Sequence, residues 1–120
     1  MLLREHRARL GDKIMGTMIS DVKASIELTS TGRLQGYIAG SAANLGPIRM
    51  VSINAHLTGA DGEITIHDNT SAAGDIKIHL KGGSASNETL NFSFGGNGVK
   101  FATAAFVTLA NIDSFTAYYG

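Results

Sequence analysis

Residues 50–57 read Met-Val-Ser-Ile-Asn-Ala-His-Leu, and the side chains along this stretch alternate between apolar and polar. The apolar positions are Val51, Ile53, Ala55 and Leu57, and the polar positions between them are Ser52, Asn54 and His56. A period of two places successive side chains on opposite faces of a β-strand. This stretch therefore predicts a strand that buries one of its faces.

The same alternation returns after a short turn. An Asp61-Gly62 pair, a strong signal for a tight turn, separates residues 50–57 from an alternating run at 63–67, which predicts a hairpin. A third strand is predicted at 75–81, with Ile76, Ile78 and Leu80 on its apolar face.

Further strands are predicted on both sides of this region. The glycine-rich residues 95–98 suggest a hairpin turn, residues 111–113 a second turn, and the small-residue stretch 40–47 a loop. The expected strands in these flanking regions are residues 18–28, 34–38, 90–94, 99–101, 106–109 and 115–119. About eight short strands at regular spacing predict an all-β fold, a small antiparallel sandwich or jelly-roll-like domain over residues 15–120.

The length and composition of the chain narrow the range of partners and sites that it could have. The chain has 120 residues, which fits one domain with a thin core, so contacts between subunits are expected to add burial. Ten basic and ten acidic side chains balance, which argues against nucleic acid as a partner. There is no cysteine, so neither a disulfide nor a thiolate metal site can form.

The first 14 residues differ from the rest. They hold four basic and two acidic residues, and Leu3, Arg7 and Leu10 would share one face of a short helix. About ten residues do not hold a helix alone in water, so residues 1–14 are interpreted as an N-terminal arm that orders on docking. The alternative is a frayed terminus.

Neither a signal peptide nor a membrane span is expected. Charged residues interrupt the first ten positions, and no stretch approaches the roughly 20 apolar residues that a spanning helix needs. These features favour a chain that is made and kept in the cytoplasm of the producing cell.

The sequence contains residue types that bind metals or act in catalysis, but not in the patterns that such sites require. His56, His67 and His79 occupy polar positions of three strands and could meet around a metal, but their spacing fits no known motif. Residues 67–71 with Asp75 offer oxygen ligands for calcium, although such residues more often cap turns. No serine lies in a nucleophile elbow. The sequence thus predicts no catalytic residue, cofactor or metal, and no enzyme.

Two tyrosines are candidates for a subunit contact. Tyr118 lies on the opposite phase from Phe115, Ala117 and Tyr119 in the last strand, so it is available to a neighbour, and the same applies to Tyr37. With the arm residues, the predicted partner-binding set is Leu2, Leu3, Arg4, Arg7, Arg9, Leu10, Tyr37 and Tyr118.

Residues 47–120 resemble small virion proteins of tailed bacteriophages. The likeness rests on residues 51–55 (Val-Ser-Ile-Asn-Ala), 60–62 (Ala-Asp-Gly), 64–70 (Ile-Thr-Ile-His-Asp-Asn-Thr), 83–90 (Gly-Ser-Ala-Ser-Asn-Glu-Thr-Leu), 98–101 (Gly-Val-Lys-Phe) and 116–120 (Thr-Ala-Tyr-Tyr-Gly). Members with known roles are similar to capsid decoration, or cement, proteins, which are compact β-sandwiches, usually trimers, on the outside of the head.

The resemblance implies a location and a partner. It implies a homotrimer on the outer head surface of the virion that binds the major capsid protein and bridges neighbouring shell subunits, with the arm reaching across to a neighbour. Two alternatives stay open at this point. One is another virion component, such as a tail, fibre or head-vertex protein, and the other is a glycan- or receptor-binding jelly roll.

Overall fold

The protein is an all-β antiparallel sandwich, as the alternating sequence predicted. It is seen in a computed structural model that describes residues 22–83 and 88–120, so the predicted arm at residues 1–14 lies outside the described part. The described residues form eleven short strands and contain no helix, and therefore no helix that could cross a membrane.

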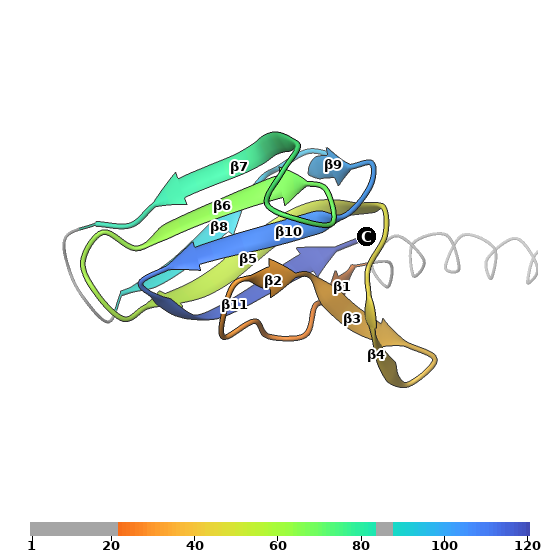
Figure 1. Ribbon diagram of the computed structural model, residues 1–120, viewed down its shortest axis with the longest axis horizontal. Coiled ribbons are helices and arrows are strands. Elements are labelled where there is room, and N and C mark those ends of the chain that lie inside the picture. Colours follow the sequence, from red (N-terminus) through yellow and green to blue (C-terminus); the bar gives the residue numbers. More distant parts are fainter. Residues whose placement is uncertain (1–21, 84–87) are drawn as a thin grey trace, which may run out of the picture.

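Two sheets pack face to face, and a small hairpin stands beside them (Figure 1). Sheet A has the order β1-β11-β5-β8, with β9 also paired to β5. Its strands are β1 (Lys23–Ala24), β5 (Ile48–Leu57), β8 (Thr89–Ser93), β9 (Val99–Phe101) and β11 (Ile112–Tyr119). Sheet B has the order β2-β10-β6-β7, and its strands are β2 (Gly32–Arg33), β6 (Glu63–Asp68), β7 (Asp75–Lys81) and β10 (Ala105–Ala110). The hairpin joins β3 (Gln35–Ile38) to β4 (Ser41–Asn44).

The core lies between the two sheets and receives side chains from both. Its fully buried large side chains are Leu34, Met50, Ile53, Leu57, Ile64, Ile66, Phe101, Val107 and Phe115. Burial of such side chains contributes about 1.5–3 kcal/mol each, so this thin layer is the main source of stability.

The predicted hairpin between β5 and β6 is wrong. β5 pairs with β8, β9 and β11 in sheet A, whereas β6 pairs with β7 and β10 in sheet B. Residues 58–62 therefore carry the chain across the core from one sheet to the other. Each of the two strands buries one of its faces. Strands show this alternation whether they are neighbours in one sheet or face each other across a sandwich, so the sequence pattern does not distinguish the two arrangements.

The glycine-rich residues 95–98 do not form a hairpin either. β8 and β9 both run antiparallel to β5 along the same edge, since Ser93 lies opposite Ser52 and Val99 opposite Met50. Residues 94–98 loop out between two collinear strands, and the Gly98 N–H donates to the Gly95 carbonyl, 2.9 Å away. Gly98 has a φ of 76°, and a Cβ there would collide with the Met50 carbonyl oxygen.

Three β-bulges change which side chains are buried. In β11, Asp113 is the extra residue, so Ile112 is buried on the even phase and Phe115, Ala117 and Tyr119 on the odd phase. In β5, Val51 is the extra residue between Met50 and Ser52, so Ile48 and Met50 are buried on the even phase and Ile53, Ala55 and Leu57 on the odd phase. In β7, Lys77 is the extra residue, and Ile76 is 58% exposed instead of lying in the core. The predicted burial of Val51 and Ile76 is corrected accordingly.

The remaining differences concern short elements. Residues 41–44 form β4 within the predicted loop, and the turn predicted at 111–113 narrows to Asn111, because β11 already begins at Ile112. Within the described part of the predicted strand 18–28, only residues 23–24 are a strand, with a single bridge from Leu28 to Phe115.

Candidate interaction surfaces

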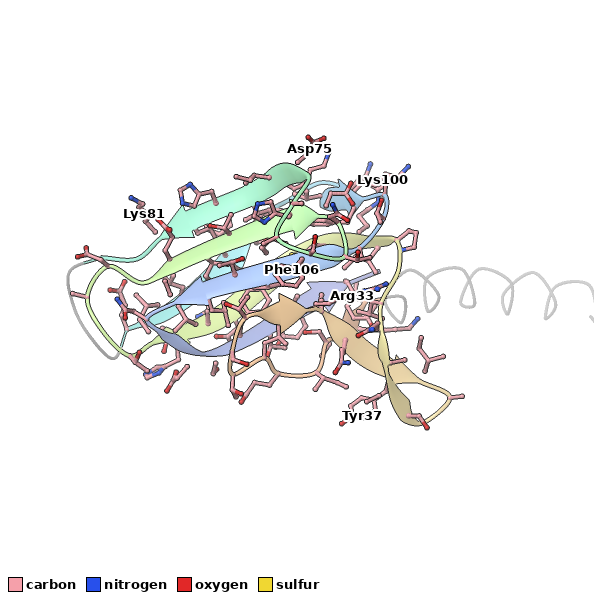
Figure 2. The ribbon with its side chains drawn as sticks, viewed as in Figure 1. Arg33, Tyr37, Asp75, Lys81, Lys100 and Phe106 are labelled. Carbon is pink, nitrogen blue, oxygen red and sulfur yellow. The ribbon has the colours of Figure 1, made fainter. Side chains whose placement is uncertain are left out.

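The β3–β4 hairpin projects from one end of the sandwich and presents apolar side chains to solvent (Figure 2). Tyr37 is 66% exposed and its neighbour Ile38 is 56% exposed, and these are two of only five large hydrophobic side chains that are exposed in the described residues. Their exposure on adjacent positions of one hairpin makes this the strongest candidate contact in the described part of the molecule.

The base of the hairpin is held by close packing. Gly36 is buried, and a Cβ there would collide with the hydroxyl of Tyr119 and crowd Leu45. The Arg33 guanidinium donates from Nε and Nη2 to the Leu45 carbonyl, at 3.2 and 2.9 Å. These contacts fix the direction in which the hairpin leaves the sandwich.

The hairpin turns through two residues with positive φ. Ala39 has a φ of 52° and Gly40 a φ of 83°, the combination of a type I′ turn. Gln35 Nε2 donates to Asn44 Oδ1, 3.0 Å away, and links the two strands at the other end. The twist of a type I′ turn matches that of paired strands, so the tip presents Tyr37 and Ile38 on a defined backbone.

Charges are partly separated along the molecule, although Asp68 and Asp75 lie beside the residues that follow β9, and Lys81 lies opposite Glu63. Arg49 and Lys100 are cross-strand partners near the end of the sandwich from which the β3–β4 hairpin projects, called the hairpin end below. Lys23, opposite Tyr119, lies at the same end. The opposite end collects the acidic residues Asp61, Glu63, Glu88 and Asp113 at the turns where β5, β6, β8 and β11 begin or end. Figure 2 shows Arg33 and Lys100 toward the hairpin end and Lys81 toward the other.

Tyr118 lies on a different surface from Tyr37. It projects from the outer face of sheet A, opposite Ser52 on β5 and Ala24 on β1, and it is partly exposed. Many of the other outer positions of sheet A carry small neutral side chains, namely Ser52, Asn54, Thr89, Asn91, Ser93, Ser114 and Thr116, and β5 adds Arg49 and His56 to this face. The structure thus places the two predicted contact tyrosines on separate surfaces. The other predicted contact residues, Leu2, Leu3, Arg4, Arg7, Arg9 and Leu10, lie outside the described residues.

The three candidate histidines do not come together. His56 lies on the outer face of sheet A, whereas His67 and His79 lie on sheet B. His56 Nδ1 is 2.8 Å from Asp113 Oδ1, and His79 Nε2 is 3.1 Å from Glu63 Oε2. Among residues 22–83 and 88–120, no group of three or more His, Cys, Asp or Glu side chains is placed to hold a metal.

Glu63 and Asp68 both form hydrogen bonds with other parts of the protein. The hydrogen bond from His79 lowers the pKa of Glu63, with Lys81 3.6 Å away on the same carboxylate. Asp68, a candidate calcium ligand, instead accepts the backbone N–H groups of Ala102, Thr103 and Ala104 at 3.0, 2.8 and 3.4 Å. These hydrogen bonds, that from Thr103 foremost, lower the pKa of Asp68.

Sequence reasoning missed two features of these surfaces. Ile38 belongs to the predicted strand 34–38, but only the tertiary position of the hairpin makes it exposed. Phe92 lies in the predicted strand 90–94, where alternation with Asn91 and Ser93 favours burial, yet it is 47% exposed because β8 is the edge strand of sheet A among the described residues. No family model matches the chain, and no curated protein or solved structure is similar enough to match it.

Proposed function

We propose that this chain is a structural virion subunit of the cement type, which decorates the outside of a phage capsid and bridges neighbouring shell subunits. The observation that carries the proposal is the projecting β3–β4 hairpin, which exposes Tyr37 on one face and Ile38 on the other. The resemblance of residues 47–120 to phage virion proteins supplies the biological setting.

The hairpin end offers the features of a protein contact. Aromatic anchors dominate many interfaces because they bury much area at a small cost in conformational entropy, and Tyr is enriched among them. Arg49 and Lys100 at the same end favour an acidic partner surface. We therefore propose the major capsid protein as the partner, through a patch that combines acidic and apolar residues.

The N-terminal arm is part of the same proposal. Residues 1–14 are basic and carry Leu2, Leu3 and Leu10, which suits a segment that lies along a neighbouring shell subunit. A homotrimer, as the resemblance implies, would place three hairpins and three arms on the shell. Deletion of residues 1–14 is expected to weaken binding to the shell without unfolding the sandwich.

Binding of hairpin variants to shells tests the proposal. Capsids that lack this chain are mixed with the purified protein, and the bound fraction is measured by co-sedimentation. Tyr37→Ser with Ile38→Ser is expected to weaken binding at least tenfold, because the two largest exposed side chains of the hairpin are removed. Ile76→Ser, a control for loss of an exposed apolar side chain on sheet B, is expected to bind like the parent protein. Equal binding by both variants would contradict the proposed role of the hairpin.

A second candidate function has one observation in its favour. The outer face of sheet A carries amide and hydroxyl groups beside Tyr118, which are groups that bind sugars, with Arg49 and Lys100 at one end of the face. A glycan- or receptor-binding role predicts binding on a glycan array that Tyr118→Ala abolishes. The cement role predicts no dependence on glycans.

A further inference from the structure

The outer edge of β8 is the one long sandwich edge in the described residues without protection against strand pairing. Soluble proteins protect such edges with short strands, charges or bulges. β1 and β2, which form two of the edges, have only two residues each. β7 carries Asp75, Lys77 and Lys81, with the bulge at Lys77. β8 reads Thr-Leu-Asn-Phe-Ser and has no charge, proline or bulge.

The free backbone groups of β8 belong to alternate residues. The Leu57 N–H donates to the Glu88 carbonyl at 2.8 Å, and the Phe94 N–H donates to the Val51 carbonyl at 3.0 Å. Antiparallel pairs alternate along a strand, so Leu90 and Phe92 also direct their backbone groups toward β5. The N–H and C=O groups of Thr89, Asn91 and Ser93 consequently point away from β5, toward the open edge.

The side chains of β8 leave part of the core uncovered at this edge. Leu90 and Phe92 lie opposite the buried residues Ala55 and Ile53, so they occupy the inner face of sheet A. Phe92 nevertheless remains 47% exposed, and its ring lies 5.4 Å from that of Phe94. An additional strand beyond β8 would cover Phe92.

We infer that β8 pairs with β8 of a second copy of this chain, antiparallel about a twofold axis at Asn91. In this register Asn91 faces Asn91 of the second copy and Thr89 faces Ser93, and each of these pairs uses the backbone groups that point outward. Leu90 then faces Phe92 of the second copy on the inner face. Polar residues thus face polar residues, apolar residues face apolar residues, and no like charges are brought together.

The chemistry favours a second copy as the occupant. Because β8 is uncharged and its sequence is self-complementary about Asn91, the same strand supplies both sides of the contact, as a twofold interface requires. The contact differs from the threefold one that the resemblance implies. It does not depend on the proposed function, since it is measured on the purified chain without shells.

Cysteine cross-linking tests the register directly. The chain has no native cysteine, and the Cα atoms of a hydrogen-bonded antiparallel pair are about 5.5 Å apart, within disulfide range. Asn91→Cys is expected to form a disulfide-linked dimer under mild oxidation at least tenfold faster than Asn54→Cys. Asn54 is the matched control, because it is exposed on the same face and lies opposite Asn91 on β5.

A second variant tests the pairing without cross-linking. Asn91→Pro removes an N–H that points away from β5, and proline is tolerated at such a position of an edge strand. It is expected to raise the dimer dissociation constant at least tenfold in sedimentation experiments, with the β-sheet circular dichroism unchanged. The inference is overturned if Asn91→Cys cross-links no faster than Asn54→Cys, or if the unmodified chain sediments as a monomer at every concentration.

Discussion

Asp68 is the clearest case of a side chain that organises backbone from a distant part of the sequence. It sits at the end of β6 and binds three consecutive N–H groups in the connection between β9 and β10. Hydrogen bonds to a charged group contribute more than neutral ones, about 1.5–3 kcal/mol in mutational series. The contribution here is smaller because the site is partly exposed.

Removal of the Asp68 carboxylate is expected to destabilise the fold. Asp68→Ala should lower the free energy of unfolding by about 1–2 kcal/mol, measured by urea denaturation. Asp75→Ala, which removes an exposed carboxylate at the start of β7, should change it by less than about 0.5 kcal/mol. Equal effects of the two substitutions would show that the three N–H contacts contribute little.

The stability contributed by Asp68 also depends on pH. Its pKa is lowered in the folded protein, so its contribution is present above the unfolded pKa and is lost as the pH falls through the folded pKa. The difference in stability between the parent and Asp68→Ala is therefore expected to shrink below about pH 4. A difference that stays constant from pH 7 to about pH 2 would contradict this explanation.

At the scale of elements, the loop between β8 and β9 depends on a close approach of two backbones. Gly98→Ala is expected to lower the free energy of unfolding by about 2 kcal/mol or more, because its φ is positive and its Cβ would meet the Met50 carbonyl. Gly95→Ala, with a φ of 63° and open space around it, should cost only about 1 kcal/mol. Thermal unfolding measures both, and similar losses would contradict the predicted collision.

These elements also show how far the sequence could predict the fold. Alternation identified β5, β6, β7, β10 and β11 and the sandwich class, because one-sided burial leaves a period-two signal. It could not show that residues 58–62 cross between sheets, nor that β8 and β9 are collinear, since strand neighbours are set by tertiary pairing. β4 escaped notice because Ser41, Ala42 and Ala43 carry little β-propensity.

The candidate contacts could be predicted only in part. Tyr37 was identified from its residue type and is exposed on the hairpin, whereas the exposure of Ile76 follows from a bulge that alternation does not reveal. Phe92 resembles a core residue in sequence. Its exposure follows from the position of β8 at an edge, which is a property of the strand order.

At the scale of the whole molecule, the balanced composition hides a partial separation of charges. Ten basic and ten acidic residues cancel, yet Arg49 and Lys100 lie near the hairpin end and the acidic turns lie at the other. A charge-steered contact through the hairpin end is therefore compatible with a neutral protein.

Charge reversal at the two ends tests this orientation. Lys100→Glu is expected to weaken binding to shells several-fold, mainly through slower association, and the loss should diminish at high salt. Lys81→Glu, the same substitution at the acidic end, should leave shell binding unchanged. A larger effect of Lys81→Glu, measured in the same co-sedimentation assay, would mean that the opposite end faces the shell.

The most direct test of the cement role is the copy number and radial position of this chain in purified virions, measured by quantitative electrophoresis and particle imaging. The proposed function predicts a copy number comparable with that of the shell protein and density on the outer head surface, with the hairpin end toward the shell. A few copies confined to a vertex or the tail would contradict it and assign the sandwich to an attachment or connector role.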